Sequence, residues 1–373
     1  MRLAIREMLR RPGRFMTAAV LLTLIAMLLM LLGGLLDGLI LRATGAINAQ
    51  RADLVVFSAT AEKSFLRSRI TPETRAQVAA VPGVESVGGI GVTQLGARVP
   101  GNGPRDLADV ALFGYQQAPD GVPAPPPDGE VWADSILKDN GVKVGQTLKL
   151  GPARSPVKVK GFVDDVSYSG AGSLWASPQT WREVQNANRP ASSVAPGVFQ
   201  ALLVRTKGDP STVADAIDRA TAKTPGGATE TVTRNEASDA IGGVKQQRSV
   251  FNQIIGVTLV IATVVVALFF ALLTVERVGL YGVLKAIGAR SRTLFGGVVV
   301  QATVVAITAA AVGTVFAVLL DVLLPPGAIP YQLLPSRVVI SSVSLIIAAI
   351  VGSTFSLRRV LRVDPASAIG RAS

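Results

Sequence analysis

The sequence predicts a membrane α-helical protein with four transmembrane helices and an α+β domain inserted between the first and second helices. The chain of 373 residues is 49% hydrophobic and 17% charged, with a mean hydropathy of +0.44, which is too apolar for an ordinary soluble protein of this size. Four uncharged apolar runs are long enough to cross a hydrocarbon layer of about 30 Å. Residues 41–249, of mixed polarity and rich in turn residues, separate the first run from the second.

The four apolar runs cover residues 15–36, 250–275, 293–320 and 338–357. Polar side chains inside them, such as Thr23 and Gln301, can be satisfied within a helix or between helices. With a few flanking residues added to the first and third runs, the predicted transmembrane segments are 15–40, 250–275, 293–323 and 338–357. The domain between the first two segments is residues 41–249, and a short loop, 324–337, joins the last two.

The charge distribution predicts the orientation. Segments 1–14, 276–292 and 358–373 carry 13 Lys or Arg against 3 Asp or Glu, whereas residues 42–248 carry 23 against 20. By the positive-inside rule, both termini and the 276–292 loop are cytoplasmic, and the inserted domain and the 324–337 loop are extracytoplasmic. The apolar run after the basic start is longer than that of a cleavable signal peptide, so we expect it to be retained.

Residues 1–14 allow two interpretations. Arg2, Arg6 and Arg10 recur every four residues, which suits a helix lying on the anionic inner leaflet of the membrane. A charged flank that only fixes the topology explains the same residues. The net charge of +12 alone would also suit a nucleic-acid partner, but its concentration beside the apolar runs favours the membrane.

The inserted domain combines strand and helix patterns, which predicts an α+β fold. A proline-rich stretch, 118–128, is expected to be an extended connector that begins a subdomain insertion at about 118–198. The predicted strands are 53–58, 84–92, 109–115, 147–150, 157–163, 202–206 and 230–233, and the predicted helices are 71–80 and 210–222.

The composition argues against catalysis. The chain has no Cys and no His, which removes disulfides, thiol nucleophiles, the commonest metal ligand and Ser/His/Asp constellations. It also has no G-x-x-x-x-G-K-[ST] phosphate-binding loop. We therefore predict no catalytic residue, no metal site and no cofactor in this chain, which is not expected to be an enzyme.

The most informative segment follows the second apolar run and reads ERVGLYGVLKAIGAR, residues 276–290. As a helix it is amphipathic and could dock in a partner's groove, although a solvated loop is the simpler reading. The segment resembles the E-R-x-x-E-[FIY]-G-x-[LM]-K-A-[IL]-G-A pattern of MacB-type ABC transporter permeases, where it forms the coupling helix that meets the ATPase. One departure is Leu280, which stands where the family has a second acidic residue.

The resemblance extends over essentially the whole chain, through residues 3–12, 52–57, 129–137, 144–147, 159–164 and 364–369. It implies a separate ABC ATPase subunit that binds ATP and Mg²⁺, a second copy of this chain, and a place in the bacterial plasma membrane. The ATPase-coupling residues that it implies are Glu276, Arg277, Leu280, Tyr281, Leu284, Lys285, Gly288, Asp364 and Pro365.

The resemblance also implies a function, which is efflux or extraction of a hydrophobic or amphipathic substrate. Residues 1–15, 53–70 and 161–169 look closest to haem-efflux HrtB-type permeases, which makes haem a specific candidate. Without His or Cys, its ligands would have to come from residues such as Met30, Asp37 and Tyr168. Packing, helix-end placement and an ordinary loop position are the plainer explanations for these three residues.

Two other functions stay open at this point. An FtsX-type permease transmits a mechanical signal that activates a cell-wall hydrolase, and a LolCE-type permease extracts lipoproteins. Asp321, like Asp37, lies near the outer end of a predicted span, where the two carboxylates either line a lateral entry for substrate or simply end their helices.

Overall fold

The structure is a computed structural model that describes residues 12–103, 105–224, 226–276, 287, 291–324 and 329–360. The chain divides into two compact units. The membrane unit is drawn from Met1–Gly38, Arg248–Pro325 and Tyr331–Ser373, and the inserted domain from Leu39–Gln247 and Pro326–Pro330. Each unit is described below by itself.

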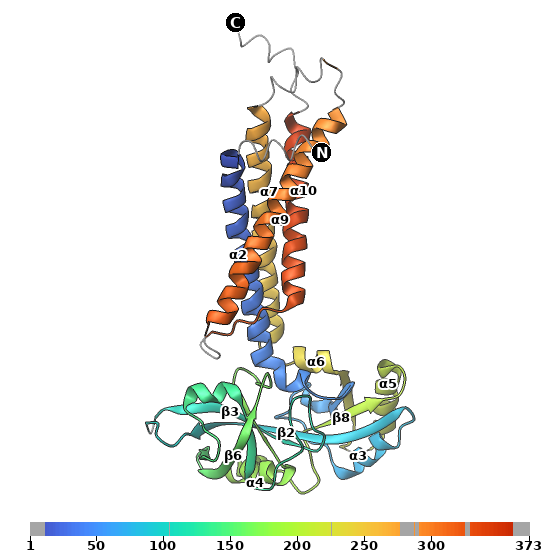
Figure 1. Cartoon of the computed structure of the whole chain (residues 1–373). Helices are drawn as coiled ribbons and strands as arrows, with labels where there is room; N and C mark the ends of the chain where they lie inside the picture. The colour runs from blue at the N-terminus through green and yellow to red at the C-terminus, as the bar shows by residue number, and fades with distance from the viewer. Residues whose placement is uncertain are drawn as a thin grey trace. The chain divides into compact units, whose positions relative to one another are not determined.

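Four long helices are apolar enough to cross a membrane (Figure 1). They are α2 (Pro12–Asn48), α7 (Val244–Val275), α9 (Ser291–Leu323) and α10 (Pro335–Val360). A sheet-rich domain lies between the first and the second of them in the chain. The predicted fold class, four transmembrane helices with an α+β insertion after the first, is thereby confirmed.

The helices are longer than the apolar runs that predicted them. α2 continues to Asn48, eight residues past the predicted end, and α7 begins at Val244, six residues before the predicted start. Hydropathy locates the part of a helix that lies in lipid, whereas residues such as Lys245 and Gln246 are good helix formers in water as well. α10 starts at Pro335 because proline is well suited to the first turn of a helix.

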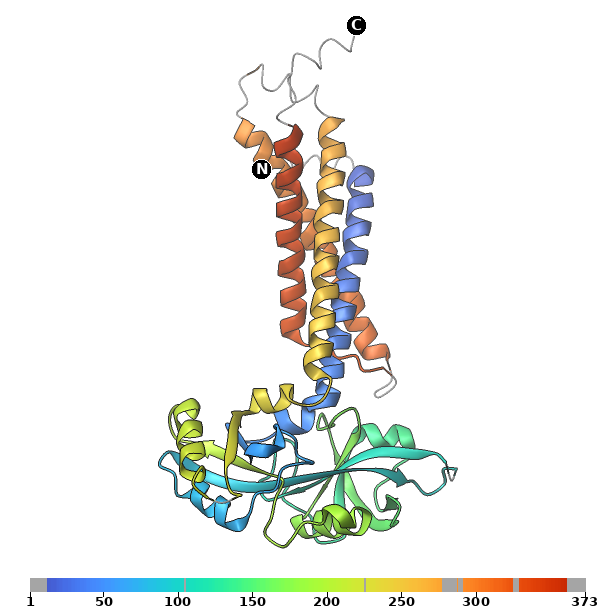
Figure 2. The ribbon, with the colours of Figure 1, turned by 180° about the vertical axis from the view of Figure 1, so that it is seen from behind.

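Small residues let the helices of the membrane unit approach closely. A Cβ on Gly313 of α9 would lie 2.8 Å from the Ala26 Cβ of α2. A Cβ on Gly352 of α10 would lie 2.5 Å from the Thr263 carbonyl oxygen of α7. Figure 2 shows α7 running beside α10 and α2, with α9 crossing behind them. Since lipid is as apolar as a leucine side chain, such close contact is a main source of helix association.

The inserted domain is built on one hydrogen-bonded sheet, with strand order β3-β7-β4-β6-β5-β2-β8-β1-β9 among the described residues. Pairing of β3 with β2 closes the six strands from β3 to β2 into a ring, and β8, β1 and β9 continue as an open sheet. The strands are β1 (Leu54–Ser58), β2 (Val84–Arg98), β3 (Leu107–Tyr115), β4 (Glu130–Asp134), β5 (Thr147–Leu150), β6 (Ser155–Val163), β7 (Gly172–Ala176), β8 (Ala201–Thr206) and β9 (Thr229–Thr233).

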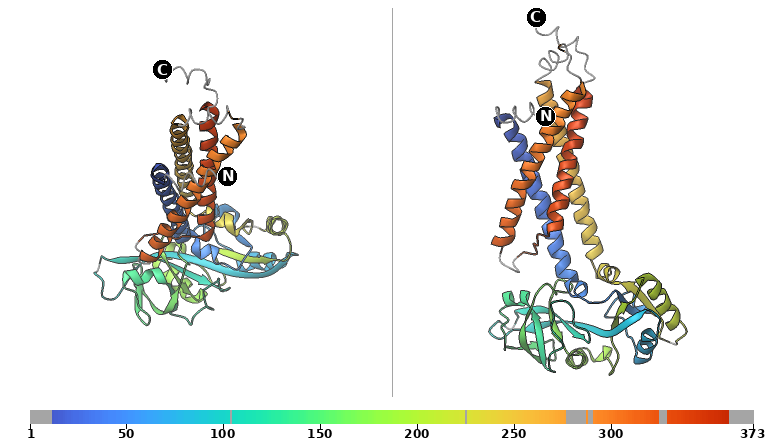
Figure 3. Two further views of the ribbon diagram at one scale, coloured as in Figure 1. Left: turned by 45° about the horizontal axis from the view of Figure 1, so that its top comes forward. Right: turned by 45° about the vertical axis from the view of Figure 1, so that its right-hand side comes forward.

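β2 belongs to both halves of the domain and runs across it as one long strand (Figure 3). Its first half pairs with β8 and its second half with β3 and β5. Ile90 and Val92 point into one buried core, while Gly91 alternates with them and leaves room for the Trp181 ring. The predicted strand, 84–92, covers only the first part of β2.

Helices cover the sheet. α3 (Pro72–Ala79) and α5 (Pro210–Thr221) pack on the open part through a core that includes Leu54, Val78 and Ile217. α4 (Pro178–Asn188) packs on the ring, and α6 (Arg234–Asp239) begins with a Thr233/Glu236 capping box. α4 was not among the predicted elements, although its Ser cap followed by Pro178 is a recognisable helix start.

Gly352 supplies a direct test of the packing between α7 and α10. We expect Gly352→Ala to destabilise the folded chain by about 1–3 kcal/mol, because the new methyl group would overlap the Thr263 carbonyl. The measurement is loss of helical circular dichroism as sodium dodecyl sulfate is titrated into mixed micelles. The matched control is Gly256→Ala on α7, where a Cβ meets open space. Equal stability of the two variants would contradict the close α7–α10 contact.

Candidate functional site

An ion pair joins α2 and α10 in the membrane unit. Arg337 Nε donates a hydrogen bond to Asp37 Oδ2 over 2.8 Å, and Arg337 Nη2 donates to Asp37 Oδ1 over 2.5 Å. The Arg337 and Asp37 side chains are only 21% and 10% exposed. Such bidentate pairs are stronger and more directional than single contacts. Because ionisable side chains within transmembrane helices are rare and usually functional, this pair is the candidate functional site of the membrane unit.

Two adjacent glycines of α2 make room for the pair and its neighbour. A Cβ on Gly33 would lie 2.4 Å from Arg337 Cδ, and a Cβ on Gly34 would lie 2.3 Å from Tyr331 Cε2. The Gln332 backbone N–H also donates to the Gly34 carbonyl over 3.1 Å. The segment before α10 therefore lies directly on the backbone of α2.

The same segment is bonded to α9. The Tyr331 hydroxyl donates to the Ala317 carbonyl over 3.3 Å, and the Leu333 backbone N–H donates to Asp321 Oδ1 over 3.3 Å. Burial and the charge of Asp321 raise the pKa of Tyr331 to about 12, so the hydroxyl keeps its proton. Asp37, Asp321 and Tyr331 thus tie α2, α9 and α10 together at one end of the unit.

Met30 lies on the same helix as Asp37, two turns away. Its side chain is fully buried, and the Thr314 hydroxyl of α9 lies 3.8 Å from its sulfur. A thioether in this position fills space between helices and accepts a weak hydrogen bond. Met30 and Asp37 therefore both face protein, each with a partner on another helix.

Tyr168 belongs to the inserted domain. Its ring makes edge-on contacts with Phe65 and Phe113, at centroid distances of 6.2 and 5.3 Å, and its backbone pairs with Ala171. Burial raises the pKa of Tyr168 to about 12, so a phenolate ligand is disfavoured at neutral pH. Met30 and Asp37 lie in one unit and Tyr168 in the other.

Most of the predicted ATPase-coupling residues lie outside the described residues. These are Arg277, Leu280, Tyr281, Leu284, Lys285, Gly288, Asp364 and Pro365. Glu276 is described, and its backbone N–H donates to the Leu272 carbonyl over 3.0 Å at the end of α7. The coupling role of this set stays a prediction.

No group of three or more His, Cys, Asp or Glu side chains that could hold a metal ion occurs within the described ranges. Arg337 was not among the predicted site residues, because the apolar run begins one residue later, at Val338. The sequence does contain a pattern from which this pair could have been predicted. Arg337 and Asp37 are opposite charges at the edges of two apolar runs, and a charge at a helix end in lipid tends to find a partner.

The membrane helices and the chain as a whole are similar to known permeases. Residues 252–365 match the FtsX-like permease C-terminal family. An uncharacterized ABC transporter permease of Mycobacterium tuberculosis H37Rv is 28% identical over 327 residues, covering 85% of each chain. A second such permease of that strain is 26% identical over 325 residues, again covering 85% of each chain. An ABC transporter permease of Mycobacterium bovis matches at 28% over 327 residues, with 85% of each chain covered.

Two solved structures resemble part of the chain. The periplasmic region of MacB from Actinobacillus actinomycetemcomitans aligns with 52% of this chain and 94% of its own, at 12% identity and a TM-score of 0.36. The extracellular domain of the ABC-type transporter YknZ from Gram-positive bacteria aligns with 49% of this chain and 98% of its own, at 13% identity and a TM-score of 0.33.

The predicted relationship to ABC transporter permeases is confirmed by the family match and by these relatives, whereas the closer relationship to HrtB-type permeases stays a prediction. The chain carries an FtsX-like permease domain and is a homologue of ABC transporter permeases.

Proposed function

We propose that this chain is the non-catalytic permease subunit of an ATP-driven complex that expels a hydrophobic or amphipathic molecule from the membrane or its outer side. ATP and Mg²⁺ bind to a separate ABC ATPase, and the complex holds two copies of this chain. The observation that carries the proposal is the FtsX-like permease match over residues 252–365, which includes most of α7, all of α9 and α10, and the predicted coupling segment.

The proposed coupling path starts at the basic segment 276–292, which follows α7 directly. α2 runs without a break from Pro12 to Asn48, and both its last residues and the first residues of α7 belong to the inserted domain. A packed helix can carry a displacement along its axis, since its backbone hydrogen bonds resist stretching. Movement imposed by the ATPase at 276–292 therefore has a continuous path along α7 to the inserted domain.

We place the chain in the bacterial plasma membrane, and the charge distribution supports an orientation with both termini and the 276–292 segment in the cytoplasm. In that orientation the inserted domain is extracytoplasmic, and lipid surrounds the exposed apolar faces of the four helices. The ATPase then binds on the cytoplasmic side, where the excess of Lys and Arg lies.

A mechanical transmitter without a transported solute is the second candidate function. It is favoured by the bonds that fasten the end of α2 to the rest of the inserted domain. The Ser238 hydroxyl donates to Asn48 Oδ1 over 2.8 Å, and Arg234 Nη1 donates to the Gln50 carbonyl over 2.8 Å. These contacts would pass force from α2 to α6, whether or not a solute moves.

The first test is ATP turnover by the purified complex in lipid, titrated with haem and with a panel of amphipathic drugs. Efflux of haem predicts a saturable change in turnover together with a shift of the haem Soret band. Turnover that responds to an amphipathic drug but not to haem would support the proposed efflux function and rule out haem as its substrate. Strong turnover that ignores every small molecule would instead favour the mechanical transmitter, or lipoprotein extraction.

The coupling segment has its own test. We expect Leu284→Asp to abolish the ATP turnover that depends on this chain, because it places a charge on the apolar face of the predicted coupling helix. Membrane insertion and yield should be unchanged. Val144→Asp, at a 59% exposed position of the inserted domain, is the control for adding one carboxylate. Full turnover in the Leu284→Asp complex would refute docking through this face.

The Asp37–Arg337 pair is proposed to fasten α10 to α2. We expect Asp37→Asn to destabilise the folded chain by about 3 kcal/mol, since it leaves the Arg337 charge largely buried and unpaired. Arg337→Gln should cost a similar amount. The measurement is detergent-driven unfolding in mixed micelles, as for the glycine variants.

The double variant, Asp37→Asn with Arg337→Gln, measures the interaction energy between the two side chains, apart from what each contributes alone. We expect it to lose less stability than the sum of the single variants, by about 0.5–3 kcal/mol of coupling energy. Strictly additive losses would mean that the two charges do not stabilise one another.

A further inference from the structure

The inserted domain contains a cavity of about 160 Å³. It opens at the edge of the buried core that holds Phe65 and Val92. Four separate segments border it: the loop after β1, strand β2, the turn that carries Tyr168, and the junction of α6 with α7, at Ile241 and Gly242. All of them belong to the inserted domain.

The walls combine apolar and polar groups, and the polar surface is the larger. Phe65 and Tyr168 supply aromatic rings, and Val92 and Ile241 supply aliphatic surface. Gln94 continues the period-two face of β2 that carries Val92, so its amide reaches the same cavity. Neither the Gln94 amide nor the Tyr168 hydroxyl hydrogen-bonds to any other described side chain or backbone group. A cavity that offers apolar contacts together with free polar groups can hold a small molecule in one orientation.

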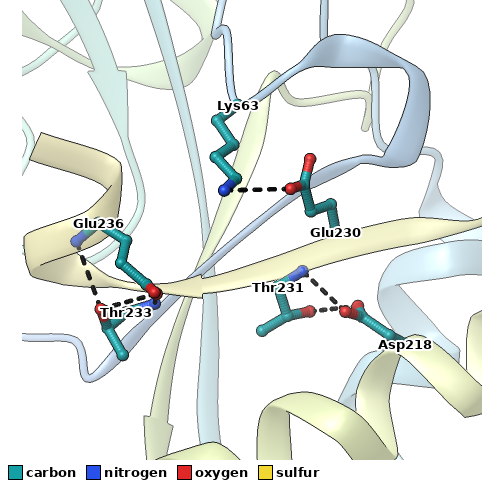
Figure 4. Close-up of polar contacts among 6 residues, drawn as sticks. All are labelled: Lys63, Asp218, Glu230, Thr231, Thr233 and Glu236. Carbon is teal, nitrogen blue, oxygen red and sulfur yellow. Dashed lines mark hydrogen bonds and ion pairs between the residues drawn. The ribbon is translucent and has the colours of Figure 1, made fainter. Parts of the chain in front are cut away.

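Negative charge is in excess around Lys63, which lines the cavity. Lys63 Nζ lies 3.3 Å from Glu230 Oε1, and Figure 4 shows this ion pair beside the Thr233 and Glu236 cap of α6. The Thr233 backbone N–H and hydroxyl, and more weakly the charge of Lys63, lower the pKa of Glu236, so this second carboxylate is ionised. One ammonium faces two carboxylates, which disfavours an anionic ligand.

The loops at the rim hold an uncommon backbone conformation. Glu62 and Lys63 have φ of 49° and 57°, and Ser169 has φ of 52°. All three are non-glycine residues in the left-handed region, which is sparsely populated and is concentrated at ligand sites and switch regions. They bring Lys63 and Tyr168 to the same cavity from loops that are far apart in the sequence.

We propose that this cavity binds a small neutral amphipathic molecule that has one six-membered ring and one hydrogen-bonding group. The ring lies against Phe65 and Tyr168, and the polar group meets the Tyr168 hydroxyl and the Gln94 amide. The volume of about 160 Å³ is close to the roughly 150 Å³ of a protein cavity that takes up benzene, so one six-membered ring fits the space. This binding does not depend on transport or on an ATPase.

The cavity walls are bonded to the last turns of α2. The Ser169 N–H donates to the Ala43 carbonyl over 2.8 Å, and the Ala46 N–H donates to the Ser167 carbonyl over 2.9 Å. On the opposite wall, Gly242 and Gly243 lead into the first residue of α7. A bound molecule therefore contacts one segment that is hydrogen-bonded to α2 and another that leads into α7.

Disulfide trapping on the full-length chain in detergent tests the proposal, since the natural chain has no cysteine to react. Ala240→Cys places a thiol at the exposed C-terminal end of α6 on the cavity rim. Ala80→Cys is the matched control, because Ala80 is also an exposed αR residue that ends a helix, away from the cavity. The probes are 2-(4-hydroxyphenyl)ethyl, phenethyl and n-butyl disulfides, each with 2-mercaptoethanol as competitor.

We expect the hydroxyphenyl adduct at Ala240→Cys to withstand at least tenfold more 2-mercaptoethanol than the same adduct at Ala80→Cys, by intact-mass measurement. The n-butyl adduct should show no such difference between the sites. Equal resistance of the hydroxyphenyl adduct at the two sites would overturn the proposal.

A second variant tests the polar contact. Tyr168→Phe in the Ala240→Cys background should lower the resistance of the hydroxyphenyl adduct at least threefold and leave the phenethyl adduct unchanged. A hydroxyphenyl adduct that is equally resistant with Phe at position 168 would overturn the role assigned to the Tyr168 hydroxyl.

Discussion

Helix association inside lipid cannot rely on burying apolar side chains, because the hydrocarbon around the helices is itself apolar. The membrane unit depends on the alternatives, which are close backbone contact and paired polar groups. α9 buries Ala302, Ala306 and Ala309 on one face, and Gly313 continues that face onto Ala26 of α2. Contact at this distance gives attraction but little orientation, since small residues fit at many rotations.

Orientation comes from the polar contacts at one end of the unit. A bidentate Arg337–Asp37 pair has one good geometry, and the glycines at 33 and 34 admit Arg337 and Tyr331 only from one side of α2. In the inserted domain, too, small residues allow close contact and a polar contact sets the orientation. Gly91 and Gly114, which pair across β2 and β3, leave the space that Trp181 of α4 fills, and the Trp181 indole N–H then donates to the Thr93 hydroxyl over 3.0 Å.

Local patterns in the sequence were enough to predict the four spans and most strands of the inserted domain, since hydropathy and side-chain alternation are local properties. The closure of six strands into a ring was not predictable in this way. It requires β2 to extend to Arg98 and pair with β5, which lies about fifty residues further along the chain. The Asp37–Arg337 pair, 300 residues apart in sequence, was missed for the same reason. The role of the coupling segment was predicted from its resemblance to a family pattern. Most of that segment lies outside the described residues.

The partners of the three proposed substrate residues limit how a substrate can be bound. Met30 packs against Thr314, Tyr168 lies among aromatic rings, and Asp37 already has both carboxylate oxygens on Arg337. A cationic or metal-bearing substrate that used Asp37 would first have to separate the pair, which strands a guanidinium in a poorly hydrated place.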